Sequence, residues 1–114
     1  MDTSVLARKL GQEKLEVAWD ALLPHAERDI LFVLDRSLDL VDVGVTMAMN
    51  QTQAIQEWME KGQFVRPSNL QKQQWTAENP LFWMLIVQPF VLIQPMTEAE
   101  RLHVVEQARS NYKA

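Results

Sequence analysis

Polar and apolar positions near the start of the chain repeat with the period of a helix. From Thr3 to about Trp19 the apolar residues return to one side, and charged residues occupy the other sides. This spacing predicts an N-terminal helix within residues 1–19. Pro24 follows in "WDALLPHAERD" and predicts the start of another turn or short helix, because proline suits a first helical turn better than an interior.

The pattern then changes to a short apolar run followed by two helical segments. Residues Ile30–Asp35, "ILFVLD", are rich in β-branched and aromatic side chains, which predicts a buried strand. Ser37 is a candidate N-cap for a helix that is apolar on most of its circumference. Asn50 can end that helix and, with Gln53, resembles a capping box that opens the next helix, which Gly62 should end. The expected inner face of this second helix comprises Ala54, Ile55, Trp58 and Met59.

A short strand and two further helices are predicted in the second half of the chain. The segment "QFVRP" has the character of a short strand. Ser68 and Gln71 have the spacing of a capping box, which predicts a polar helix after them. Thr97 and Glu100 repeat this spacing and predict a C-terminal helix within residues 97–114.

The most apolar stretch is "PLFWMLIVQPFVLIQP", residues 80–95. About fourteen residues separate its outer prolines, whereas a membrane-spanning helix needs roughly twenty. We therefore expect a strand with two apolar faces and a bulge, an edge position or a break at Pro89, which cannot donate to a ladder. Helices would cover one face, and the terminal helix or a second copy of the protein would cover the other. Trp83 and Phe90 are accordingly candidate interface residues, together with Trp75 on the polar helix, since aromatic residues are enriched at interfaces.

Composition narrows the functional classes. A chain of 114 residues with 47% hydrophobic residues suits one domain with a real core. The absence of cysteine excludes disulfides, thiolate metal sites and cysteine nucleophiles. The first ten residues lack the apolar segment of a signal peptide, so we expect a cytoplasmic protein. The net charge of −4 argues against nucleic-acid binding, which needs a basic surface.

The densest group of ionisable residues is "PHAERD", which contains His25, Arg28 and Asp29. One interpretation makes His25 a general base or ligand oriented by a carboxylate. The favoured interpretation is a polar turn, with His25 bonded to a backbone carbonyl and Arg28 paired with Asp29 or Asp35, because no second catalytic partner stands at a diagnostic spacing. We therefore predict no enzymatic activity, no cofactor and no metal.

The middle of the chain resembles the core of a winged helix-turn-helix domain. The resemblance rests on "LDLVDVGVTMAMNQTQAIQEWMEKGQFVRP", in which a buried helix leads through a tight turn to a second helix and then to an apolar-x-Arg strand. It implies a core over residues 30–94, with Phe82–Val87 as the returning wing strand. Two features depart from the family. A capped polar helix replaces the basic hairpin, and the presumed recognition helix presents Gln53, Gln56, Glu57 and Glu60.

A broader resemblance covers about Val17 to Gln94. The segments "VAWDALLPHAERDILFVLDRSLDLVDVGV", "AIQEWMEKGQFVRP" and "FWMLIVQPFVL" are similar to a family of short, uncharacterised bacterial proteins known only as a domain of unknown function. The resemblance implies a bacterial, soluble, stand-alone protein. It brings no activity, cofactor or catalytic residue.

The sequence as a whole predicts an α+β fold with a single domain over residues 1–114. Its expected parts are the N-terminal helix, a winged-helix-like core of helix, strand, two helices and two strands, and the C-terminal helix. The predicted function is a non-enzymatic protein-interaction module, capable of self-association as a homodimer. A winged-helix transcriptional regulator that binds DNA is the first alternative, and a small enzyme or ligand binder using the His25 region is the second.

Overall fold

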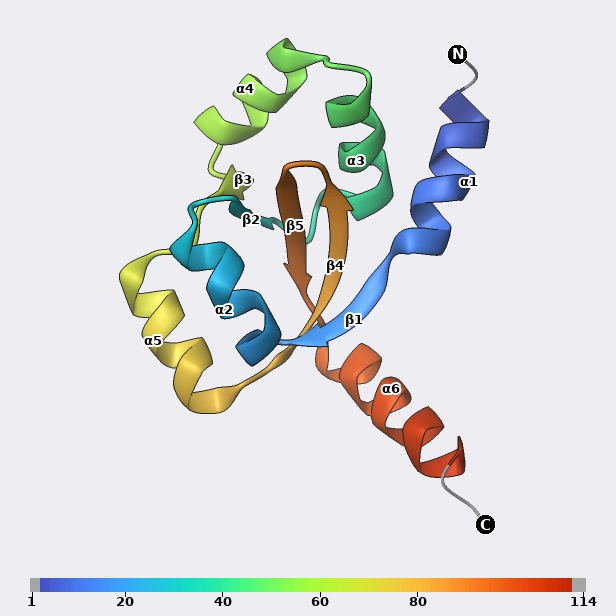
Figure 1. Cartoon of the computed structure of the whole chain (residues 1–114), viewed down its shortest axis with the longest axis vertical. Coiled ribbons are helices and arrows are strands. Elements are labelled where there is room, and N and C mark those ends of the chain that lie inside the picture. Colours follow the sequence, from blue (N-terminus) through green and yellow to red (C-terminus); the bar gives the residue numbers. More distant parts are fainter. Residues whose placement is uncertain (1–2, 112–114) are drawn as a thin grey trace.

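A computed structural model of the chain describes residues 3–111. The outermost residues of the two expected terminal helices, 1–2 and 112–114, lie outside the described residues. Figure 1 shows the arrangement of the elements. In chain order they are α1 (Thr3–Glu13), β1 (Leu15–Ala18), α2 (Trp19–Glu27), β2 (Leu31–Leu34), α3 (Leu40–Ala48), α4 (Thr52–Glu60), β3 (Phe64–Val65), α5 (Asn69–Glu78), β4 (Leu81–Val87), β5 (Phe90–Pro95) and α6 (Glu98–Asn111).

One mixed sheet organises these elements into a single α+β domain, as predicted. The strand order is β1-β4-β5-β2-β3. Strands β2 and β5 run parallel, and the other neighbours run antiparallel. The most apolar strands, β4 and β5, therefore lie inside the sheet, where both of their faces need cover.

Helices α2 and α5 cover one face of the sheet. Strand residues that point to this face pack with the buried side chains of Trp19, Leu22 and Ala26 from α2. Trp75 from α5 packs against the same cluster. The strand residues in the cluster are Leu31, Val33, Phe82, Met84, Val91 and Ile93.

Helices α1, α3 and α4 cover the opposite face. Leu10 of α1 and two residues of α3, Leu40 and Val43, are buried there. The strand side chains in this second cluster alternate with those in the first, as the period of a strand requires. They are Phe32, Leu34, Phe64, Leu85 and Leu92.

The stretch from Pro80 to Pro95 forms a hairpin rather than one strand. Pro89 lies in the turn between β4 and β5, which is the break expected from its missing N–H. The expected alternation of two apolar faces along Phe82–Val87 is confirmed. The expected cover was wrong, because helices of the same chain pack on both faces. The terminal helix α6 instead points away from the sheet (Figure 1).

The N-terminal region differs from the prediction in two places. The first helix ends at Glu13, and residues of the expected helical face continue as β1, an edge strand paired with β4. The interior strand β4 needs a hydrogen-bonded neighbour on that side, and this tertiary demand overrides helical periodicity. Pro24 lies inside α2 rather than at its start. The burial of Trp19 and Leu22 on α2 outweighs the one hydrogen bond that the proline removes.

Two predicted caps at helix N-termini are confirmed, and two were wrong. Ser68 with Gln71 forms a complete capping box, and Thr97 with Glu100 forms another. Asp39, not Ser37, caps α3, and its carboxylate accepts the backbone N–H of Asp42 at 3.0 Å. Ser37 instead donates to the nearby carboxylate of Asp35, which lowers the pKa of Asp35.

The turn between α3 and α4 explains the second wrong cap. Asn50 adopts a positive φ of 59° just after α3, so it ends that helix as predicted. It forms no capping box with Gln53, and α4 begins after Gln51 with no side-chain cap. Gly62, with a φ of 73°, follows the end of α4 as expected.

The winged-helix resemblance is not confirmed. Helices α3 and α4 follow one another as expected, and the short strand β3 comes next. The wing would require β3 to pair with β4, but β3 lies at the far edge beside β2, while β4 lies between β1 and β5. Among the helices of residues 3–111, none has both the length and the apolar character that a bilayer span requires.

Candidate functional site

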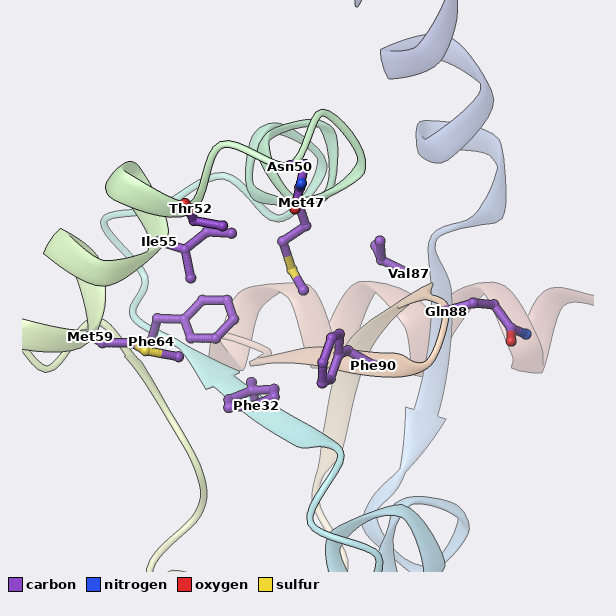
Figure 2. Close-up of a pocket in the computed structure, with 10 residues that line it drawn as sticks. All are labelled: Phe32, Met47, Asn50, Thr52, Ile55, Met59, Phe64, Val87, Gln88 and Phe90. Atoms are coloured by element: carbon purple, nitrogen blue, oxygen red, sulfur yellow. The ribbon is translucent and has the colours of Figure 1, made fainter.

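A pocket of about 340 Å³ opens between α3, α4 and the tip of the β4–β5 hairpin (Figure 2). Its walls come from both helices and from four strands, β2, β3, β4 and β5. In Figure 2 the side chains of Met47, Ile55, Phe64 and Phe90 converge on the same space. The full lining comprises Phe32, Met47, Asn50, Thr52, Ile55, Met59, Phe64, Val87, Gln88 and Phe90.

The pocket exists because α4 packs only partly against the sheet. Among its residues, Ile55 and Trp58 pack against the buried cluster, but no side chain of α4 is fully buried. The ends of α4 are set by the turn at Asn50 and by the backbone N–H of Gln63, which donates to the carbonyl of Trp58 at 2.8 Å. Met59 consequently remains 45% exposed beside the opening.

Aromatic rings form the floor of the pocket. The rings of Phe32 and Phe64 lie 4.8 Å apart. Phe90 meets Phe32 edge-on at 5.7 Å. The guanidinium of Arg66 lies 5.0 Å from the Phe32 ring, and its Nε donates to the carbonyl of Asp29. These contacts support the aromatic floor by stacking and cation–π attraction.

The chemistry of the pocket suits binding rather than catalysis. No side chain in its lining carries a charge. The polar groups are the amides of Asn50 and Gln88 and the hydroxyl of Thr52, none of which is a general acid or base near neutral pH. The site can therefore accept an apolar group and offer it a few neutral hydrogen-bonding partners at the rim.

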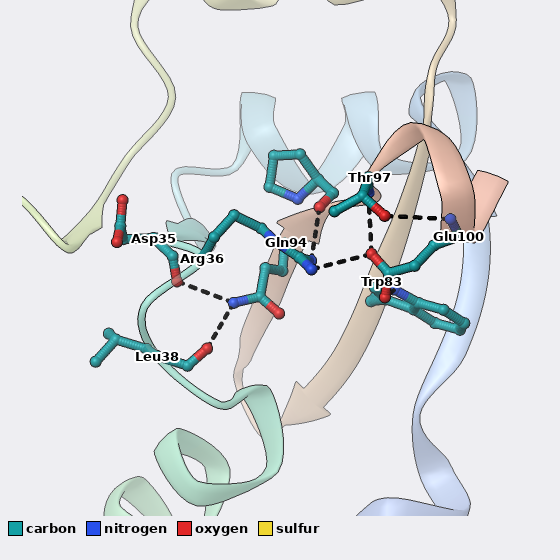
Figure 3. A network of polar contacts seen from close by, with 8 residues as sticks. Asp35, Arg36, Leu38, Trp83, Gln94, Thr97 and Glu100 are labelled. Carbon is teal, nitrogen blue, oxygen red and sulfur yellow. Dashed lines mark hydrogen bonds and ion pairs between the residues drawn. The ribbon is translucent and has the colours of Figure 1, made fainter.

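A polar network lies at the other end of the sheet, where α6 begins (Figure 3). The carboxylate of Glu100 accepts the Trp83 indole N–H at 3.0 Å and the Thr97 backbone N–H at 2.9 Å. It also forms an ion pair with Arg36 at 3.1 Å. The ammonium of Lys14 lies 4.6 Å from the Trp83 ring.

The electrostatics of this network stabilise the ionised carboxylate. Partial burial of Glu100 acts to raise its pKa. Hydrogen bonds from Thr97 and Trp83, together with the charge of Arg36, outweigh that effect and leave the pKa of Glu100 below its usual value. This arrangement anchors α6 to the sheet. The indole N–H of Trp83, a candidate interface residue, thus has its hydrogen-bond partner within the same chain.

Gln94 fixes the loop that carries Arg36. It is buried in β5, and its amide nitrogen donates to the carbonyl of Asp35 at 2.9 Å and to that of Leu38 at 2.7 Å. The β2–α3 loop is thus held against β5 by a buried amide (Figure 3).

The third candidate interface residue, Trp75, packs inside its own domain. Its ring lies 5.1 Å from that of Trp19 and 5.0 Å from that of Phe82. The Trp19 indole N–H donates to Thr76 at 3.1 Å. Trp75 therefore holds α5 on the sheet, while Phe90 alone of the three sequence-derived candidates lines the apolar pocket.

The contacts expected within the polar cluster around His25 are not formed. His25 lies in the last turn of α2, and its buried Nδ1 has no hydrogen-bond partner. The expected pairing of Arg28 with Asp29 or Asp35 is absent among the side chains of residues 3–108, where the one ion pair joins Arg36 to Glu100. Within the same residues no three histidine, aspartate or glutamate side chains gather to hold a metal.

Most pocket residues were not recognisable from the sequence. Met47, Ile55 and Phe64 have the pattern of ordinary core residues, and Val87 belongs to the apolar hairpin. The one local signal is Asn50, whose tolerance of positive φ allows the tight turn that sets α4 at a distance from the sheet.

Comparisons with known proteins give a family and no activity. None of the curated proteins matches the chain. Its structure is similar to the NMR solution structure of PA1075 from Pseudomonas aeruginosa, with a TM-score of 0.71 and 28% sequence identity. The similarity covers 84% of this chain and 89% of that one. The family model described as "Protein of unknown function (DUF2288)" matches residues 5–95. The chain therefore belongs to the DUF2288 family of proteins of unknown function.

Proposed function

We propose that the protein is a non-enzymatic protein-interaction module whose binding site is the pocket between α3, α4 and the β4–β5 turn. The observation that carries the proposal is the pocket's uncharged lining, apolar but for three polar residues and open to solvent beside Met59. Its volume of about 340 Å³ lies at the lower end of the range of roughly 300–1,000 Å³ that ligand pockets occupy. That size suits one or two bulky apolar side chains of a partner.

The side chains of the lining favour an adaptable protein contact. Met47 and Met59 are unbranched and polarisable, which lets them adjust to different apolar groups. Phe32 and Phe90 supply a firm aromatic floor, and aromatic residues dominate the energy of protein interfaces. An interface of this kind needs no reactive group, in keeping with the proposed absence of catalysis.

The surface around the pocket also favours protein over nucleic acid. Glu57 and Glu60 are exposed on the outer side of α4, where they would repel phosphates. The polar rim made by Asn50, Thr52 and Gln88 is instead suited to hydrogen bonds with a partner's backbone.

A matched pair of variants tests the proposal by affinity capture from the native host. Met59→Arg places a charge at the pocket entrance, on a side chain already 45% exposed, and should abolish capture of the specific partner. Leu70→Arg makes the same change at a position 69% exposed on α5, away from the pocket, and should leave capture intact. Equal capture by both variants and the wild type would exclude the pocket as the binding site.

A further inference from the structure

The outer edge of β1 combines an open ladder with an exposed apolar patch. Strand β1 forms one border of the sheet, with α1 before it and α2 after it (Figure 1). Leu15 is 51% exposed. Ile86 of the neighbouring strand is 41% exposed and lines the same shallow hollow. Both side chains lie on the face that carries α2 and α5, because Leu15 is directly opposite Met84.

The hydrogen bonds of β1 show which backbone groups remain open. Trp19 donates its N–H to the carbonyl of Pro80 at 3.0 Å, so odd-numbered residues of β1 direct their backbone groups toward β4. Glu16 therefore presents its N–H and C=O groups to the outside, and Ala18 presents its N–H there, since its C=O accepts the first hydrogen bond of α2. Such an edge can accept another strand.

The side chains on the other face add a charge pattern. The ammonium of Lys14 lies over the Trp83 ring, and Glu16 is directly opposite Trp83 in the strand register. Lys14 and Glu16 consequently lie on the same face of the sheet, two residues apart and opposite in charge. A strand paired with β1 would place its own side chains beside Lys14 and Glu16.

We propose that a second copy of the chain pairs with β1 about a twofold axis centred on Leu15. An antiparallel twofold pairing must bring the outward-facing Glu16 opposite another even-numbered residue of the second copy. Its centre is therefore at Leu15, Glu16 or Val17, which places Glu16 opposite Lys14, Glu16 or Ala18, respectively. A centre at Glu16 places two glutamates opposite one another, which is repulsive. A centre at Val17 places Glu16 opposite Ala18. Only the centre at Leu15 places Lys14 opposite Glu16, and it does so twice.

The same register also covers the apolar patch. The two Leu15 side chains become a directly opposed pair, where side chains approach most closely, with Ile86 beside each of them. The charges of Lys14 and Glu16 on one face and the apolar side chains of Leu15 and Ile86 on the other thus favour the same register, centred on Leu15. The paired segment is short, so the dimer is expected to be weak. Leu15 and Ile86 lie on the face of the sheet opposite to the pocket, and the dimer does not depend on the proposed function.

Charge reversal tests the register by sedimentation equilibrium over a concentration series. Lys14→Glu and Glu16→Lys each place like charges opposite one another twice, and each should weaken the dimer by roughly tenfold or more. The double variant carrying both changes restores opposite charges and should recover dimerisation. Lys61→Glu, just after α4, and Glu57→Lys, on α4, make the same charge changes at exposed positions and should leave the dimer unchanged.

Three results would overturn the proposal. The first is a monomeric wild type up to its solubility limit. The second is a dimer that the single reversals do not weaken, which would place the contact elsewhere. The third is a double variant that stays as weak as the single ones, which would exclude this register. Met59→Arg should not alter the dimer, and Lys14→Glu should not alter partner capture. Failure of the pocket proposal can therefore be distinguished from failure of the dimer proposal.

Discussion

The indole Nε1 of Trp83 lies 3.0 Å from Oε2 of Glu100, and this hydrogen bond joins the central sheet to the C-terminal helix. Glu100 also caps α6 and pairs with Arg36, so a single carboxylate holds the helix in place. Helix α6 lies beyond residues 5–95, which the family model matches. The core of the domain should therefore depend little on it.

Removing the carboxylate should release α6 without unfolding the sheet. Glu100→Ala removes the acceptor for Trp83 and for the N-terminal end of the helix, and loss of such a cap costs about 1 kcal/mol. Amide hydrogen exchange should accelerate in α6 and change little in β4 and β5. Glu106→Ala, an exposed position on the same helix, is the matched control and should leave exchange unchanged. Equal acceleration throughout the sheet would show that α6 supports the core.

The same anchor should be sensitive to acid. The pKa of Glu100 is lowered in the folded protein, so its contribution is fully present above the ordinary glutamate value of 4.5 and is lost as the pH falls through the lower folded-state pKa. The NMR signal of the Trp83 indole N–H should shift in that acidic range. In Glu100→Gln this titration should disappear, and its persistence would assign the titration to another group.

The buried amide of Gln94 should contribute measurably to stability. Gln94→Leu leaves the carbonyls of Asp35 and Leu38 without their donor, which should cost about 1–3 kcal/mol in the free energy of unfolding by urea. Gln88→Leu, at the exposed hairpin turn, should change the free energy of unfolding by less than about 0.5 kcal/mol. Similar effects of the two substitutions would contradict the role assigned to the buried amide.

Two helical glycines should respond oppositely to alanine. At Gly44 an added Cβ would lie 2.7 Å from Cδ2 of the buried Leu85, and such overpacking costs about 1–3 kcal/mol. The gain in helix propensity offsets about 1 kcal/mol of this, so Gly44→Ala should destabilise by up to about 2 kcal/mol. At Gly11 nothing lies within 4 Å, and alanine should stabilise by about 0.5–1 kcal/mol. Thermal unfolding of both variants checks the difference, and equal stabilisation would contradict it.

Local signals in the sequence predicted the elements that depend on local chemistry. The capping boxes at Ser68 and Thr97, the end of α3 at Asn50 and the buried strand at Leu31–Leu34 all formed as expected. Each rests on a side chain or backbone preference that acts within a few residues. The two-sided apolar pattern of β4 is local in the same sense, since it follows from strand alternation alone.

The wrong predictions concern elements that depend on distant partners. The segment Leu15–Ala18 has a helical spacing, but it becomes a strand because β4 requires a neighbour. The hairpin around Pro89 places β4 and β5 inside the sheet, so the chain covers both of their faces itself. The pocket could not be predicted from the sequence for the same reason, because its existence depends on how far α4 lies from the sheet. Phe90 was identified as a candidate interface residue for its apolar character, and the structure places it in the pocket wall.

The most direct test of the central claim is an NMR titration of methionine methyl groups with indole as a mimic of an apolar side chain. Met47 and Met59 line the pocket, whereas Met84 is buried on the opposite face of the sheet. If the pocket accepts apolar groups, the signals of Met47 and Met59 should move and saturate while that of Met84 stays in place. Static signals from Met47 and Met59 up to the solubility limit of indole, or an equal movement of Met84, would contradict the claim.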